Sequence, residues 1–270
     1  GHVTLVGLCT AWLGLLVSES RLGAHAAGAL AQCSAFVGFT LHVGVGELRQ
    51  TWWIPLGLAV LLRAHQTRSW RWFLGLGITL GACVLSCFYH GLFLALAVSV
   101  WALLTLRPSV KLLGGYLLAA AMGIGMTVPT LRSFSTTYEG DPPAEVVEPG
   151  GATVHGYRRS AAHLDHLVTW RVAPAGDNYR QERAYTGGRY LGWGTLLLAV
   201  VGLVAAPRRA LPWLAASAAG ITLSLGSVIW WNEAMVKVDG RALVLPFAWL
   251  NATMAQHAEG APRIQDLHQR

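Results

Sequence analysis

A short polar segment between two apolar runs carries the residues best suited to chemistry in this chain. The segment HVGVGELRQ begins at His42 and places Glu47 and Arg49 directly before the next apolar run. An ionisable group close to a bilayer is costly unless it is paired or faces water. Arg49 could therefore hold a phosphate, and Glu47 could ligate a metal or accept a hydrogen bond from a sugar hydroxyl. The alternative is a solvated ion pair in a turn.

A second candidate, His90, stands in the sequence FYHG between two further apolar runs. An imidazole titrates near neutral pH, so His90 could bind a lipid phosphate or transfer a proton. In the alternative interpretation, Tyr89 and His90 cap a tight hairpin that Gly91 permits. Arg132 follows a later apolar run and could add to an anion-binding face. The candidate substrate-binding residues are therefore His42, Glu47, Arg49, His90 and Arg132.

Motifs of soluble catalytic domains are missing from the sequence. It contains no Walker loop, GxGxxG, HExxH, paired CxxC or GxSxG pattern, which disfavours an ATP-driven transporter and a soluble-type hydrolase. The four cysteines all fall in apolar runs, where we interpret them as packing residues rather than disulfide partners or metal ligands. These are Cys9, Cys33, Cys83 and Cys87. We predict no metal site from the spacing of the residues.

The elements that must position the candidate residues are predicted to be membrane helices. Hydrophobic residues make up 54% of the chain and charged residues 12%, and the mean hydropathy is +0.46, values outside those of ordinary soluble domains. Runs such as GLFLALAVSVWALLTL are apolar on every face, unlike the alternating strands of a barrel. We predict an all-α fold, a polytopic transmembrane helix bundle of about eight spans with one long extracytoplasmic loop. The spans are expected at residues 3–18, 24–44, 51–63, 70–88, 91–106, 112–131, 190–206 and 211–229.

The predicted spans divide the chain into four parts. Residues 1–131 should hold the first six spans, and residues 132–189 the extracytoplasmic loop, in which AAHLDHLVTWRVAP has the pattern of a short amphipathic helix. Residues 190–229 should hold the last two spans, and residues 230–270 an extracytoplasmic or interfacial tail.

The basic residues predict the orientation of these helices. Short loops rich in Lys and Arg stay in the cytoplasm. Because successive spans cross the membrane in opposite directions, one side receives the three basic loops RAHQTRSWR, LRPSVK and PRRA. The net charge of +7 is then explained largely by basic residues facing anionic membrane lipid, so no nucleic-acid partner is required. HVGVGELRQ, FYHG and the long loop fall on the opposite, outer face. The candidate residues are therefore expected at one membrane surface.

The order of these segments resembles that of a GT-C-type polytopic glycosyltransferase. The resemblance rests on GELRQTWWIPLGLAVLLRA, on YLGWGTLLLAVVGL after the outer loop and on LPFAWL near the C-terminus, and it is greatest to YfhO-type bacterial members. It implies a multi-pass protein of the bacterial inner membrane that moves a sugar from a polyprenyl-phosphate donor to an acceptor at the outer face. In such enzymes a divalent cation, Mg²⁺ or Mn²⁺, is often found near the lipid phosphate.

The resemblance also implies an acidic catalytic base in a first outer loop, and that loop has no match here. We therefore expect a fragment that begins after the catalytic base and is inactive alone. Two other classes stay open: an O-antigen polymerase or ligase-like protein, and a transporter or non-catalytic membrane scaffold. The predicted spans carry no Asp, Glu, Lys or Arg away from their ends, which disfavours the transporter.

Overall fold

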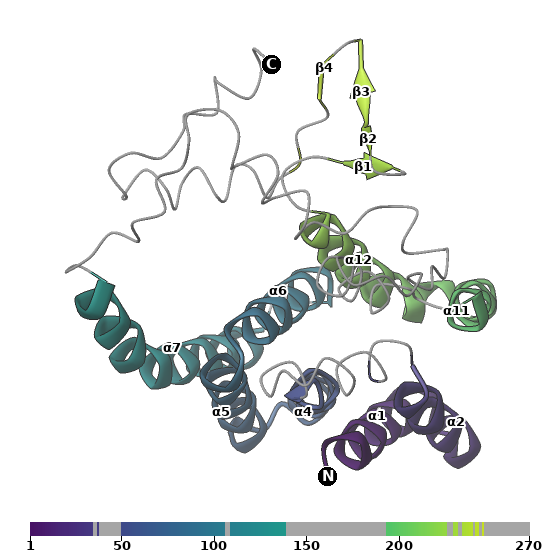
Figure 1. The fold of residues 1–270 in the computed structure, drawn as a ribbon. Coiled ribbons are helices and arrows are strands. Elements are labelled where there is room, and N and C mark those ends of the chain that lie inside the picture. Colours follow the sequence, from purple (N-terminus) through teal and green to yellow (C-terminus); the bar gives the residue numbers. More distant parts are fainter. Residues whose placement is uncertain are drawn as a thin grey trace. The chain divides into compact units, whose positions relative to one another are not determined.

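The structure is a computed structural model of the 270-residue chain, and eight helices and four short strands lie in the part that it describes (Figure 1). The described residues are 1–34, 37, 50–105, 109–138, 193–225, 229–231, 234–239, 241–242 and 245. The helices are α1 (His2–Ser18), α2 (Arg21–Gln32), α4 (Trp53–Thr67), α5 (Trp70–Ser86), α6 (Phe88–Thr105), α7 (Val110–Tyr138), α11 (Trp193–Ala205) and α12 (Pro207–Ser224). The strands are β1 (Trp230–Trp231), β2 (Ala234–Met235), β3 (Lys237–Val238) and β4 (Arg241–Ala242).

The chain forms two compact units. The first consists of residues 1–144 and 206–216, and the second of residues 145–205 and 217–270. In the first unit, α5 packs against α4, α6 and α7, while α1 packs against α2 and α4 (Figure 1). In the second unit, a small apolar cluster joins Leu225 and Leu245 to Ile221 and Ile229.

The helices fall on apolar runs expected from the sequence, which confirms that the described part of the chain is mainly helical. Within the described residues, one segment, Val110–Thr130 of α7, is both long and apolar enough to cross a membrane. The shorter apolar helices include α1 and α5, each of 17 residues, which extend over about 25 Å. The described residues therefore do not show eight membrane spans, and that number stays a prediction.

Helix α7 is longer than the sequence predicted. Its apolar part, Val110–Thr130, matches the span expected at residues 112–131, but the helix continues to Tyr138, about two helical turns past residue 131. The helix also contains Pro129, which lacks the N–H that would bond to the carbonyl one turn earlier. Figure 1 shows α7 bent along its length, as a proline inside a helix predicts.

Two β-hairpins in the second unit correct the prediction of an all-α fold. β1 pairs with β2, and β3 pairs with β4 with Lys237 opposite Ala242. Asp239 follows β3 with a φ of 51°, the left-handed conformation that two-residue hairpin turns require. The Asp-Gly dipeptide at residues 239–240 was the sequence signal for this turn. Hydropathy missed the hairpin because each strand has only two residues.

Small residues bring α5 and α7 close together. Phe73 of α5 lies against Gly115 of α7, and farther along both helices Gly77 lies against Ala119, so the two helices run parallel. A Cβ atom on Gly77 would lie 2.6 Å from the carbonyl oxygen of Ala119. Small residues at four-residue intervals allow such close contact between membrane helices. The contact therefore depends on the absence of a side chain at Gly77.

A glycine also sets the packing of α5 against α6. The chain reverses at Cys87, and α6 begins at Phe88, so Gly91 lies inside the helix. A Cβ atom on Gly91 would lie 2.6 Å from the Cα of Val84. The prediction that Gly91 forms the FYHG hairpin is therefore wrong, because its role is to let two helices approach.

Candidate functional site

The structure describes two of the five predicted substrate-binding residues. His42, Glu47 and Arg49 lie outside the described residues, so their predicted roles stay predictions. Arg132 is exposed on α7, although it was expected in a loop. His90 lies in the first turn of α6 and is buried, with 5% of its surface exposed. The site is therefore built outward from His90.

The buried imidazole of His90 lacks a hydrogen bond that its burial calls for. Within the described part of the chain, its Nδ1 atom has no hydrogen-bond partner. A polar atom left unpaired away from water typically costs about 1–3 kcal/mol, and native structures contain few of them. His90 was expected at a membrane surface, and the structure shows in addition that its side chain is buried within the protein. An unpaired atom of this kind fits a group that binds a ligand.

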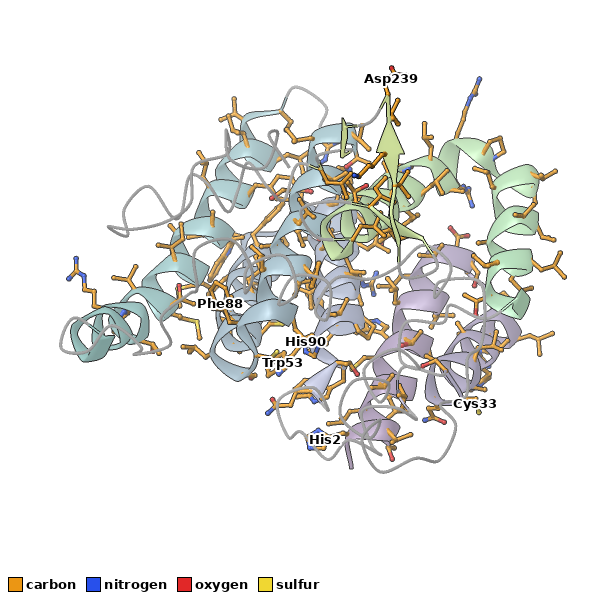
Figure 2. All side chains as sticks on the ribbon, turned by 45° about the horizontal axis from the view of Figure 1, so that its top comes forward. His2, Cys33, Trp53, Phe88, His90 and Asp239 are labelled. Carbon is orange, nitrogen blue, oxygen red and sulfur yellow. The ribbon has the colours of Figure 1, made fainter. Side chains whose placement is uncertain are left out.

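Helices α4 and α6 run parallel, which places the start of α4 level with His90. Near their N-terminal ends, Gly57 lies against Leu94, and farther along the ring of His65 lies 4.9 Å from that of Trp101. Following this register back by one turn brings Trp53 to the level of His90. Figure 2 shows the two labelled side chains in the same region of the molecule.

A pair of stacked indoles lies at the start of α4, at the level of His90. The rings of Trp52 and Trp53 are 4.0 Å apart and inclined by 27°. Trp53 donates from Nε1 to Oε1 of Gln50 at 3.4 Å, whereas the buried Nε1 of Trp52 has no partner among the described residues. Buried indole N–H groups usually have a partner. We call Trp52, Trp53 and His90 the Trp–His cluster.

The Trp–His cluster contains groups of the kinds that contact ligands, and it has no carboxylate that could act as a base. Of the described residues, only Glu19 and Asp239 are acidic, and they belong to the end of α1 and to the second unit. The cluster offers aromatic rings for stacking and two unpaired polar nitrogens, Nε1 of Trp52 and Nδ1 of His90. These groups suit a ligand with both an apolar face and hydrogen-bonding oxygens.

The four cysteines differ in exposure, so the interpretation of all four as packing residues holds only in part. Cys83 and Cys87 are buried, as expected of packing residues, whereas Cys33 is exposed, so its interpretation as a packing residue is wrong. All four cysteines are free thiols.

The described residues contain no group of three or more His, Cys, Asp or Glu side chains that could hold a metal. The divalent cation implied by the resemblance stays a prediction.

A second polar contact, which the sequence analysis missed, lies at the other end of the same helices. Nδ1 of His65 on α4 lies 3.1 Å from the hydroxyl of Tyr116 on α7. The rings of His65 and Trp101 also form an edge-to-face contact. Phe73 of α5 contacts Tyr116 in the same way, with ring centroids 5.2 Å apart. The sequence signal was a polar side chain inside an apolar helix, but it does not reveal the partner.

Comparison with known proteins does not add to these observations. No protein-family model, curated protein or solved structure matches the chain. The similarity to GT-C-type glycosyltransferases therefore stays an interpretation of the sequence.

Proposed function

We propose that the chain belongs to a multi-pass protein of the bacterial inner membrane that transfers a sugar from a polyprenyl-phosphate donor to an acceptor at the outer face. In this proposal the Trp–His cluster contacts the sugar and phosphate of the donor. The observation that carries the proposal is the buried, unpaired Nδ1 of His90, level with a stacked pair of indoles.

Exposed apolar side chains support the membrane location. On α7, Leu117 and Ile124 are 62% and 60% exposed, while Ala119 is on the face that contacts α5. On α11, Leu197 and Val204 are also largely exposed. Large exposed apolar patches are uncommon on soluble proteins. Lipid tails would cover these side chains, and helices of 17 residues are at the lower limit for crossing a bilayer.

The chemistry of the cluster supports a lipid-linked sugar as the ligand. The C–H face of a sugar ring can stack on an indole, while its hydroxyls bond to polar nitrogens such as Nε1 of Trp52. A phosphate leaving group gains negative charge as the bond to the sugar breaks, and a hydrogen bond donated by the imidazole N–H of His90 would stabilise that charge. The catalytic base is expected elsewhere, since the cluster contains no carboxylate.

The proposal is tested with the full-length protein that contains this chain, reconstituted in vesicles with a polyprenyl-phosphate-linked sugar. Donor consumption is followed by chromatography for the unchanged protein and for His90→Ala. Loss of one charge-assisted hydrogen bond should lower kcat/KM by about 10- to 100-fold. His25→Ala is the matched control, because His25 is exposed on α2, and it should leave the rate unchanged.

Two results would count against this proposal. If His90→Ala consumes the donor as fast as the unchanged protein, the cluster does not contact the donor. If the full-length protein consumes no lipid-linked donor, a non-catalytic scaffold becomes the better interpretation. An O-antigen polymerase or ligase would show itself by preferring a lipid-linked oligosaccharide over a single sugar.

A further inference from the structure

Four basic residues gather at the end of the first unit that lies away from the Trp–His cluster. Arg63 is in the last turns of α4, Arg68 follows α4, Arg71 is in the first turn of α5, and Lys111 is in the first turn of α7. We call these four residues the basic end.

Contacts between the helices place these residues at one level. The hydrogen bond between His65 and Tyr116 joins the last turns of α4 to the second turn of α7. The contact of Phe73 with Tyr116 joins the first turn of α5 to the same point. Arg71 precedes Phe73 on α5 by about half a turn, and Lys111 precedes Tyr116 on α7 by about one and a half turns. The basic end is therefore a surface shared by three helices.

The charges of the basic end are exposed and are not neutralised by the described part of the protein. All four side chains are exposed, and Glu19 is the single acidic residue that the structure describes in the first unit. Four cations close together repel one another, so the surface favours an anion from outside the chain.

An aromatic side chain indicates what kind of anion this is. Trp70 is 62% exposed, and the guanidinium carbon of Arg71 lies 5.8 Å from the centre of its ring. Exposed tryptophans beside basic residues are typical of the level at which lipid headgroups meet water. A soluble anion would have no need of the apolar indole, whereas a phospholipid presents both a phosphate and acyl chains.

We propose that the basic end binds the headgroups of anionic phospholipids through Arg68, Arg71 and Lys111, with Trp70 against the upper part of the acyl chains. The proposal rests on the membrane location inferred above, and it does not depend on the transferase activity. The basic end would then fix the depth of α4, α5 and α7 in one leaflet.

The test measures which lipids stay with the protein. The full chain is reconstituted in vesicles of equal parts phosphatidylglycerol and phosphatidylcholine, extracted in mild detergent, and its retained lipids are quantified by mass spectrometry. The unchanged protein should be enriched in phosphatidylglycerol. Each basic residue near an anionic surface contributes a factor of about five, so Arg68→Gln with Arg71→Gln should reduce this enrichment by up to about thirty-fold.

Two further variants test whether the enrichment depends on the positive charges at positions 68 and 71. Arg68→Lys with Arg71→Lys keeps both charges and should retain most of the enrichment. Lys237→Gln removes one exposed cation of β3 in the second unit and should leave the enrichment unchanged. Inorganic phosphate should not displace the lipid.

Three outcomes would overturn the proposal: no enrichment in the unchanged protein, equal enrichment in the double glutamine variant, or displacement by inorganic phosphate, which would indicate a site for a soluble anion. Because the readout is retained lipid, failure here is distinct from failure of the transfer assay.

Discussion

The close contact of α5 with α7 makes Gly77→Ala the sharpest perturbation of the fold. The new Cβ would lie 2.6 Å from the carbonyl oxygen of Ala119 and 2.7 Å from the Cβ of Met122. The first of these distances is about 0.8 Å short of ordinary contact, and backbone atoms cannot move aside as the end of a flexible side chain can. The helices must therefore separate along the whole contact.

The expected cost follows from overpacking. Forcing an extra carbon into a well-packed contact typically costs about 1–3 kcal/mol. Replacing glycine by alanine within a helix returns up to about 1 kcal/mol through helix propensity. The measured value for Gly77→Ala alone would mix these two effects, so a matched control is needed.

Gly125→Ala supplies that control on α7. Gly125 lies in the same kind of helical backbone, but a Cβ atom there would meet nothing within 4 Å. Its variant should gain the helix propensity without the clash. The difference between the two variants therefore isolates the clash, and we expect Gly77→Ala to be less stable than Gly125→Ala by about 1–3 kcal/mol.

The assay is reversible unfolding by sodium dodecyl sulfate in mixed micelles, followed by circular dichroism. The unfolding midpoint of Gly77→Ala should fall well below that of Gly125→Ala. Equal midpoints would refute the reasoning, because they would mean that α5 and α7 do not approach closely at Gly77.

Three further predictions follow from individual contacts. Tyr116→Phe removes the hydroxyl that meets His65 and should lower the free energy of unfolding by about 1 kcal/mol; an unchanged unfolding curve would mean that this bond contributes nothing. A maleimide should label exposed Cys33 much faster than buried Cys83, which mass spectrometry of the folded protein would show; equal rates would contradict the packing of α5. Asp239→Val places a β-branched residue at a φ of 51° and should cost about 1–2 kcal/mol, measured as faster hydrogen exchange in β3 and β4; unchanged exchange would argue against the hairpin turn.

The positions of the helices could be predicted because they follow from hydropathy alone. Long apolar runs mark α5 and α6, and the short polar break between them marks their boundary. The end of α7 could not be predicted in this way, since its last turns, SFSTTY, are polar and continue the helix without any apolar signal. The strands were missed because two residues are too few to show an alternating pattern.

The candidate site was predicted only in part. His90 was identified as a polar residue between apolar runs, but its burial depends on the close approach of α5 and α6 at Gly91, which hydropathy does not reveal. Trp52 was included in the site because its buried Nε1 has no hydrogen-bond partner among the described residues. This follows from how the side chains pack, which the sequence does not show.

The proposal that the Trp–His cluster contacts a lipid-linked sugar is tested most directly by crosslinking. Trp53 is replaced by the photoreactive residue p-benzoyl-phenylalanine in the full-length protein, which is then irradiated with a radiolabelled polyprenyl-phosphate-linked sugar. The same replacement at the exposed His25 of α2 is the control. Our account predicts a labelled protein band for position 53 and none for position 25. Equal labelling at both positions, or none at position 53, would contradict it.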